Sequence, residues 1–243
     1  MVINMDYEAD VYWNKGVLHD VNQDSLVLIQ ALTSQGRVLM ATICDGMGGM
    51  DMGEVASGYL TEELVTWFYD GLLNAIGRKK ALWIIGRCAR RKLYQIQRRL
   101  ECYANKRSLE IGTTMSMLIL WEKRYLIWHL GDSRIYRLKR GREARVQLLT
   151  KDHADNEGRL FKCIGNFGYF VPDFIMGSVK KGEAFLICSD GFRKRIDMEE
   201  MCEALSPSRI RENRIRKHLR EIGDAAMRRG ERDDISAVYI KIC

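Results

Sequence analysis

The pattern of apolar positions along the chain predicts two kinds of element. Short, nearly continuous apolar runs that end at Gly, Asp or charged residues are typical of buried strands. Runs of this kind predict strands at 38–44, 114–120, 125–129, 135–138, 185–188 and 235–240. Apolar residues spaced by three and four are typical of helices with one buried face. This spacing predicts helices at about 54–70, 80–103, 198–205 and 208–229.

The order of these elements indicates a fold class. Strand runs follow one another, and long helices are inserted between them, which differs from the regular βαβ alternation of a parallel sheet. We therefore expect an α+β protein with a central antiparallel β-sandwich and helices packed outside it.

The composition favours one globular domain. The chain has 243 residues, of which 47% are hydrophobic and 29% are charged, with two prolines and no repeat or linker-like tract. We expect a single domain over 1–243. The sequence contains neither a membrane-length apolar run nor a secretory signal, and its seven cysteines are scattered without a CxxC pair. A reducing, cytoplasmic location is therefore expected, with no disulfide framework and no zinc site.

A net charge of +7 is carried partly by the predicted helices, over 80–107 and 209–229. A basic helix face can bind nucleic acid or acidic lipid. It is more often a solvated outer face whose apolar side packs on the sheet. We favour the second interpretation, and expect neither a nucleic-acid partner nor a membrane partner.

Acidic residues stand at the margins of the apolar, strand-like segments. Five of them have this position: Asp24, Asp45, Asp132, Asp190 and Asp233. Asp beside Gly is also ordinary turn chemistry, so the spacing alone leaves open whether these side chains meet. If they do, their mutual repulsion requires a cation, and oxygen ligands are those that Mg²⁺ and Mn²⁺ prefer. A pair of such ions can hold a water and orient a phosphate for attack.

Seven short motifs, in order, resemble those of the PPM (PP2C-like) metal-dependent protein serine/threonine phosphatases. The resemblance extends from about residue 16 to about residue 240, nearly the whole chain. The motifs are Asn22-Gln23-Asp24, Asp45-Gly46-Met47-Gly48-Gly49, Gly112-Thr113-Thr114, Gly131-Asp132-Ser133-Arg134, Leu149-Thr150-Lys151-Asp152-His153, Ser189-Asp190-Gly191 and Asp233-Asp234-Ile235-Ser236.

The resemblance implies a β-sandwich flanked by helices on both faces and two or three divalent cations, Mn²⁺ or Mg²⁺. Asp45 would bridge the two core metals, and the Gly46 carbonyl would be a further ligand of one of them. The other core metal would be bound by Asp190 and Asp233. Met47 stands where animal members often have His, so the resemblance is to the bacterial type.

Three further residues take supporting roles by the same resemblance. Asp132, together with Asp190, would supply a weaker third metal site. Asp24, and Gln23 where the family often has Glu, would hold metal-bound waters.

The chain departs from the family pattern in three places. His19 stands where the family has a phosphate-binding Arg, so we expect weaker phosphate binding and a rate that favours mildly acidic pH. The flap region near 154–164 is short, which predicts an open site. Asp234 replaces the usual Asn, and it either adds negative charge beside the metals or points away as a turn acid.

The implied reaction is hydrolysis of phosphoserine and phosphothreonine in proteins, without a phosphoenzyme intermediate. The expected partners are phosphorylated proteins and a cognate bacterial-type Ser/Thr kinase, and we expect a monomer. The alternative is a catalytically weak or inactive relative that only binds its targets. Five retained metal-type acids argue against this alternative, and His19 argues weakly for it.

Overall fold

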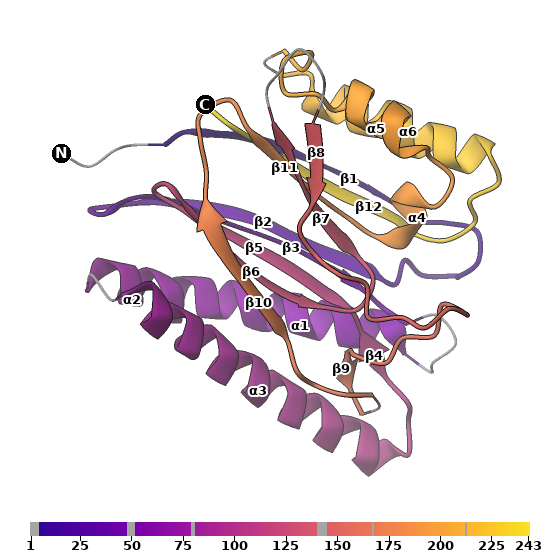
Figure 1. The fold of residues 1–243 in the computed structure, drawn as a ribbon. Helices are drawn as coiled ribbons and strands as arrows, with labels where there is room; N and C mark the ends of the chain where they lie inside the picture. The colour runs from indigo at the N-terminus through magenta and orange to yellow at the C-terminus, as the bar shows by residue number, and fades with distance from the viewer. Residues whose placement is uncertain (1–4, 48–51, 79–80, 140–144, 167, 212) are drawn as a thin grey trace.

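Two antiparallel five-stranded sheets pack face to face, and helices cover the outer face of each (Figure 1). The computed structural model describes residues 5–47, 52–78, 81–139, 145–166, 168–211 and 213–243. The layers run helix, sheet, sheet, helix, which confirms the predicted α+β sandwich with helices on both faces.

The first sheet contains the strand that closes the chain. Its strand order is β1 (Tyr7–Asn14), β12 (Ile235–Ile242), β11 (Ala184–Cys188), β7 (Arg134–Lys139) and β8 (Arg145–Leu148). The second sheet contains the strand that ends at Asp45. Its order is β10 (Asp173–Ser178), β6 (Arg124–Leu130), β5 (Met115–Trp121), β3 (Gly36–Asp45) and β2 (Asp24–Thr33). A separate short pair joins β4 (Gly112–Thr113) to β9 (Ile164–Gly165).

Strand β3 shows why the sequence forms two layers of core. Alternate side chains of a strand point to opposite faces of its sheet. Val38 and Met40 pack with the helices outside the second sheet. Leu39 and Ala41 pack between the two sheets. Both faces are covered, and this is why the run is apolar apart from Thr42.

The described helices over the second sheet are α1 (Gly53–Trp67), the short π-helix η1 (Phe68–Leu72), α2 (Leu73–Gly77) and α3 (Leu82–Arg107). Three helices cover the first sheet: α4 (Asp190–Arg193), α5 (Met198–Ala204) and α6 (Ile215–Arg228). No helix in the described part of the chain is both long and apolar enough to cross a membrane.

Two helix predictions need correction. The helix predicted from Ser208 begins only at Ile215, because a turn at Ser206–Arg209 and a positive φ of 59° at Asn213 interrupt the backbone before it. The helix predicted over 54–70 continues through the π-helix η1 to Gly77. Lys80, the predicted start of the next helix, lies outside the described residues.

Candidate metal centre

Asp24 and Asp45 face each other at one end of the second sheet. Asp24 begins β2, Asp45 ends β3, and the antiparallel register pairs them directly. Directly opposed residues on neighbouring strands have Cβ atoms about 5 Å apart, so like charges there repel.

Two more acids come from the first sheet. Asp190 is the first residue of α4 and follows β11 after Ser189. The Ser189 N–H donates to the Ser236 carbonyl (2.9 Å), and the Ser236 N–H donates to Ser189 Oγ (3.0 Å). These bonds hold the end of β11 against the start of β12, which Asp233 precedes. Asp132 lies in the turn that connects β6 of one sheet to β7 of the other.

The five acids form one electrostatic cluster. The pKa of the Asp45 carboxyl is well above its usual range because the group is buried, and because the charges of Asp24, Asp190, Asp132 and Asp233 act on it. The sequence-predicted acids are therefore brought together. Sequence spacing alone left this open.

Other members of the cluster show the same effect. Burial, and then the charges of neighbouring carboxylates, raise the pKa of Asp24 and Asp132. Burial and Asp190 likewise raise the pKa of Asp233. Lys194 forms an ion pair with Asp190, four residues before it. Buried carboxylates at this density favour a bound cation.

The donor atoms fit a divalent cation. Within the described residues, Asp24 Oδ2, Asp190 Oδ1 and Gln23 Oε1 are buried and accept no hydrogen bond. Buried oxygen acceptors without a donor are rare and costly. Carboxylate and amide oxygens are the ligands, direct or through water, that Mg²⁺ and Mn²⁺ take.

Two threonines fix the backbone of Asp45. The Asp45 N–H donates to Thr114 Oγ1 (3.0 Å), and the Thr114 N–H donates to the Asp45 carbonyl (2.8 Å). Thr113 Oγ1 also donates to that carbonyl (3.0 Å). Sequence reasoning placed these threonines in a motif but gave them no role. Their position directly after Gly112 is the sequence feature that could have indicated a role at the site.

Gly46 occupies a place that admits no side chain. Its N–H donates to the Gln23 carbonyl (3.1 Å), and the next N–H, of Met47, donates to the Gly112 carbonyl (3.0 Å). A Cβ at Gly46 would lie 2.5 Å from the Gly53 carbonyl oxygen and 2.6 Å from that of Gln23. The rest of the predicted turn, Gly48 and Gly49, lies outside the described residues.

The Asp132 turn is held by residues from two other segments, α4 and the stretch that contains Asp152 and His153. Arg193 Nη2 donates to the Asp132 carbonyl (3.0 Å), a contact that sequence reasoning missed. Arg134 donates to both carboxylate oxygens of Asp152, with its shortest hydrogen bonds at 2.9 and 2.8 Å, and so joins two of the sequence motifs. The Gly131 N–H donates to His153 Nδ1 (3.2 Å).

His129 is fully buried beside this turn and stacks on His153, with ring centroids 4.9 Å apart. Burial first, and the neighbouring His153 second, lower the pKa of His129 to about 4. The unfolded chain therefore binds a proton near pH 6.5 that the folded protein does not bind until about pH 4.

We expect His129 to make stability depend on pH. Its contribution is complete above about pH 6.5 and decreases as the pH falls toward 4, by at most about 3 kcal/mol. Urea unfolding in EDTA at several pH values checks this, with His129→Gln beside the wild type. The wild type should lose more stability than the variant between neutral and acidic pH. Equal losses would contradict the assignment.

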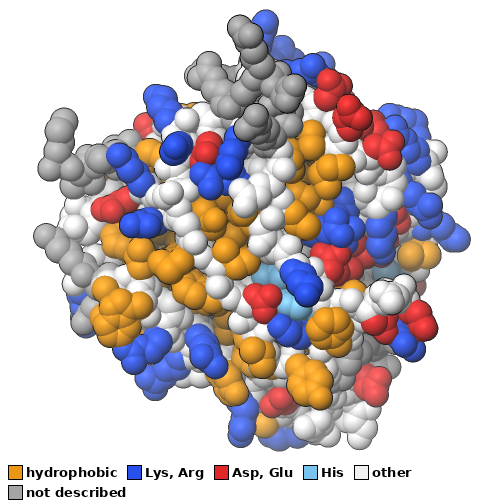
Figure 2. All heavy atoms as spheres, in the orientation of Figure 1, with side chains coloured by type: hydrophobic (Ala, Val, Ile, Leu, Met, Phe, Trp, Pro, Cys, Tyr) orange, Lys and Arg blue, Asp and Glu red, His pale blue; other side chains and the backbone are white. Residues whose placement is uncertain are grey.

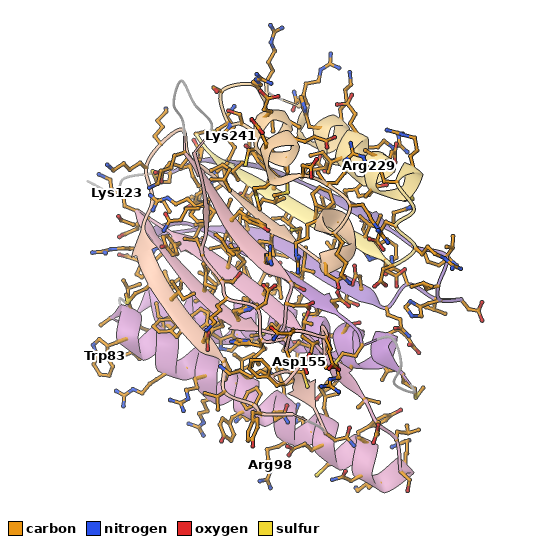
Figure 3. All side chains as sticks on the ribbon, turned by 45° about the vertical axis from the view of Figure 1, so that its right-hand side comes forward. Trp83, Arg98, Lys123, Asp155, Arg229 and Lys241 are labelled. Carbon is orange, nitrogen blue, oxygen red and sulfur yellow. The ribbon has the colours of Figure 1, made fainter. Side chains whose placement is uncertain are left out.

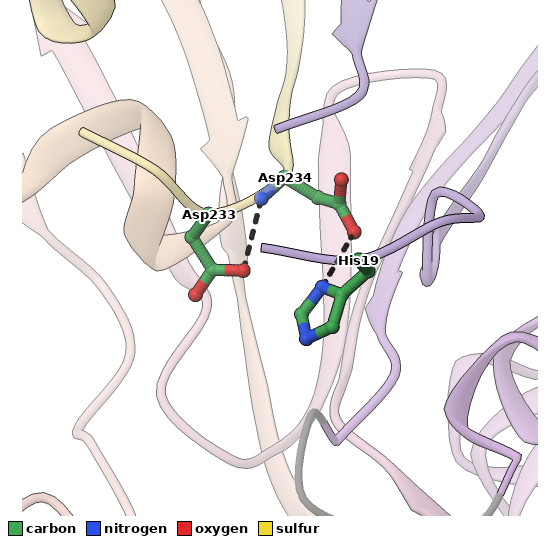
Figure 4. Close-up of side chains that lie close together, drawn as sticks. All are labelled: His19, Asp233 and Asp234. Atoms are coloured by element: carbon green, nitrogen blue, oxygen red, sulfur yellow. Dashed lines mark hydrogen bonds and ion pairs between the residues drawn. The ribbon is translucent and has the colours of Figure 1, made fainter. Parts of the chain in front are cut away.

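His19 and Asp234, two of the departures from the family pattern, meet in the structure (Figure 4). His19 Nδ1 lies 3.4 Å from Asp234 Oδ2, and ligand atoms of His19, Asp233 and Asp234 lie within 4.8 Å of one another. Asp234 accepts the N–H groups of Gly16 and Gln23, each at 2.8 Å. Asp234 therefore anchors the loop before β2, which favours the interpretation of a turn acid.

The carboxylate cluster offers the oxygen donors of a divalent-cation site, and comparisons with known proteins give the class of protein that carries it. The family model described as protein phosphatase 2C matches residues 19–228. The chain belongs to the protein phosphatase 2C family.

Two bacterial phosphatases are among the relatives it resembles. The serine/threonine phosphatase stp of Listeria welshimeri is 24% identical over 222 residues, which cover 83% of this chain and 84% of the relative. The PstP phosphatase of Mycobacterium tuberculosis is 26% identical over 94% of this chain and 44% of its own length.

Solved structures share the fold. The catalytic domain of PstP in complex with two manganese ions has a TM-score of 0.75 and 25% identity, over 98% of this chain and 99% of that one. The Stp1 phosphatase from Staphylococcus aureus has a TM-score of 0.82 and 22% identity, over 100% of this chain and 98% of that one.

Proposed function

We propose that the carboxylate cluster is the catalytic centre of a protein phosphatase that hydrolyses phosphoserine and phosphothreonine. The observation that carries this proposal is the convergence of five acids, several of them buried, in a chain of the protein phosphatase 2C family. A cluster of this kind is costly as a structural feature alone, because the buried charges repel one another. The family membership supports the enzyme over a relative that only binds its targets.

The residues divide into three roles. Asp45, with the Gly46 carbonyl, and Asp190 with Asp233 would hold two divalent cations. Asp132 would share a third cation with Asp190. Asp24 and Gln23 would hold waters on these ions through their unpartnered oxygens, a role in line with their places at the first residue of β2 and just before it.

When bound, divalent cations lower the pKa of water and neutralise charge that develops on a phosphoryl group. The chain itself keeps the ligands in place. Thr113 and Thr114 fix the Asp45 backbone, Arg193 fixes the Asp132 turn, and Asp234 fixes the loop that carries His19. Ligands fixed in this way give a cluster that needs little reorganisation.

The substrates are phosphorylated proteins, and we propose an opposing bacterial-type Ser/Thr kinase as partner. The relatives named serine/threonine phosphatase support the substrate class. A monomer in the cytoplasm is the state we propose, with the short loop at 154–164 leaving the site open to large substrates.

The proposal is tested by hydrolysis of p-nitrophenyl phosphate and of a phosphothreonine peptide. Purified protein is assayed in EDTA and again after Mn²⁺ or Mg²⁺ is added. We expect turnover only with metal, and its loss in Asp190→Ala. A folded protein without turnover in any divalent ion would refute the proposal and favour a relative that only binds.

His19→Arg is expected to strengthen substrate binding. The imidazole lies beside Asp233 and Asp234, and a guanidinium there would offer a permanently charged, two-pronged donor to phosphate. We expect the KM for p-nitrophenyl phosphate to fall about three- to tenfold. His218→Arg, on the outer helix α6, is the matched control and should leave KM unchanged. An unchanged KM in His19→Arg would remove His19 from the site.

A further inference from the structure

Helix α3 has an outer face that the catalytic proposal does not use. The helix contains eight Lys or Arg residues and one acidic residue, Glu101. Its apolar side, with Ile85, Leu93 and Ile96, is buried in the core over the second sheet. The basic side faces outward, and Figure 3 shows Trp83 and Arg98 projecting from it.

Four arginines of this face have no acidic partner. Among the described residues, no carboxylate forms an ion pair with Arg87, Arg90, Arg91 or Arg98. Some other exposed arginines are paired, for example Arg99 with Glu63, Arg216 with Asp10 and Arg229 with Glu200. The four arginines therefore form a concentrated positive surface that no ion pair within the described ranges neutralises.

Three of these arginines, Arg87, Arg90 and Arg91, line an apolar hollow. A shallow, open depression with a volume of about 620 Å³ lies on the outer side of α3, and its lining is Ile84, Arg87, Cys88, Arg90, Arg91 and Tyr94. Trp83 and Tyr94 are 59% and 51% exposed beside it. Figure 2 shows blue basic and orange apolar side chains alternating over the lower part of the molecule, where α3 lies. We call this hollow with its three arginines, together with Trp83, the α3 groove.

We propose that the α3 groove binds an acidic segment of the protein substrate, apart from the phosphorylated residue itself. The proposal rests on the proposed phosphatase function. Carboxylates of the segment would pair with the three guanidinium groups of the groove, and one of its apolar side chains would enter the hollow next to Ile84 and Tyr94. Unpaired arginines around an exposed aromatic residue are the composition from which binding hot spots are built.

The aromatic rings argue against nucleic acid as the occupant. Single-stranded nucleic acid needs free ring faces on which bases stack. The Arg87 guanidinium lies over the Trp83 ring, 4.4 Å from its centroid, and Tyr94 meets Phe170 edge to face with centroids 5.2 Å apart. Both rings therefore already have packing partners, and the remaining exposed surface is a hollow bordered by guanidinium groups.

The burial of α3 argues against a membrane. A membrane-surface helix inserts its apolar face into the lipid. The apolar face of α3 is instead occupied by the core of the second sheet. Lipid binding would therefore rest on charge alone, and the hollow would have no function.

The groove lies away from the acid cluster. The C-terminal half of α3 contacts β9 through Gln97, whose side chain bonds the backbone of Gly165. The pair β4–β9 leads to Thr113 at the metal centre. The groove is on the other half of the helix, so a docked segment would act as a tether that raises the local concentration of the phosphorylated residue.

Binding is measured first, without any phosphate. The probe is a fluorescein-labelled peptide of alternating glutamate and leucine, followed by fluorescence anisotropy. We expect the double variant Arg90→Glu/Arg91→Glu to bind the peptide with an affinity at least about tenfold lower than that of the wild type. The matched control is Arg209→Glu/Lys217→Glu, which changes the net charge equally on the opposite layer and should bind as the wild type does. Equal weakening in both variants would overturn the proposal, as would no binding by the wild type.

The second measurement joins the groove to catalysis. A phosphothreonine peptide is linked through flexible spacers of several lengths to the glutamate–leucine segment. We expect kcat/KM to rise about tenfold over the unlinked peptide for the wild type and not for Arg90→Glu/Arg91→Glu. Hydrolysis of p-nitrophenyl phosphate should be equal in both proteins. Linked and unlinked peptides with equal kcat/KM at every spacer length would overturn the docking role.

Competing occupants are tested with the same variants. Single-stranded DNA, or phosphatidylglycerol vesicles, that bound more tightly than the peptide and lost binding in Arg90→Glu/Arg91→Glu would overturn the proposal. Failure of the phosphatase function is seen separately, as absent p-nitrophenyl phosphate hydrolysis in metal, because the anisotropy measurement needs no catalysis.

Discussion

Asp45→Asn is expected to abolish metal-dependent hydrolysis and, in the absence of metal, to stabilise the protein. Asp45 is the acid whose pKa is raised by burial and by four neighbouring carboxylates. Its folded-state pKa lies above its unfolded value, so its charge at neutral pH opposes folding. Removing that charge should stabilise the metal-free protein by about 1–3 kcal/mol, and kcat/KM should fall about thousandfold or more.

Thermal unfolding in EDTA and in Mn²⁺, beside the kinetic assay, checks both effects. The Tm of the wild type should rise with Mn²⁺ more than that of Asp45→Asn, whose Tm in EDTA should be the higher of the two. Asp70→Asn, an exposed acid on η1, is the control and should change neither quantity. A less stable Asp45→Asn in EDTA would show that the cluster is held by contacts other than a cation.

Gly46→Ala is expected to disrupt the site through the backbone alone. The added methyl group would meet the carbonyl oxygens of Gly53 and Gln23 at about 2.5 Å, and neither of these backbone atoms can turn aside. Separating them would move the start of β2 and so displace Asp24 relative to Asp45. We expect a loss of about 3 kcal/mol in the free energy of unfolding and about a hundredfold loss in kcat/KM.

Gly58→Ala is the matched control for this substitution. Its Cβ would have only Ser25 Oγ nearby, at 4.0 Å, and it lies inside α1, where Ala is favoured over Gly by roughly 0.5–1 kcal/mol. Urea unfolding and p-nitrophenyl phosphate kinetics distinguish the two variants. If both glycines tolerated alanine equally, Gly46 would have no special role at the metal centre.

The strands that the sequence predicts are those in the middle of each sheet. All six predicted strands are central: β12, β11 and β7 in one sheet, and β6, β5 and β3 in the other. The four longer strands it missed, β1, β2, β8 and β10, are the sheet edges. A central strand is covered on both faces and reads as an apolar run, whereas β10 alternates between half-buried and exposed positions. An edge strand therefore lacks the continuous apolar run by which the central strands are predicted from the sequence.

The site shows a similar division. The sequence places each acid at the end of a strand, but only the strand order brings these ends together. The register of β2 with β3 opposes Asp24 and Asp45, and no local pattern states that register. The contact of Arg193 with Asp132 joins residues 61 positions apart, and nothing near either residue signals it. The role of Asp234 as a loop anchor was open for the same reason.

The origin of the five acids has a mechanical consequence. Asp24 and Asp45 belong to one sheet, Asp190 and Asp233 to the margin of the other, and Asp132 to the connection between them. Cations bound by this cluster would be held by ligands from both sheets and would therefore cross-link the two layers. The sandwich should then resist shear more strongly when loaded, so the force needed to slide one sheet past the other in an optical trap should rise with Mn²⁺. The proposed catalytic centre would then also stabilise the packing of the two sheets that position its ligands.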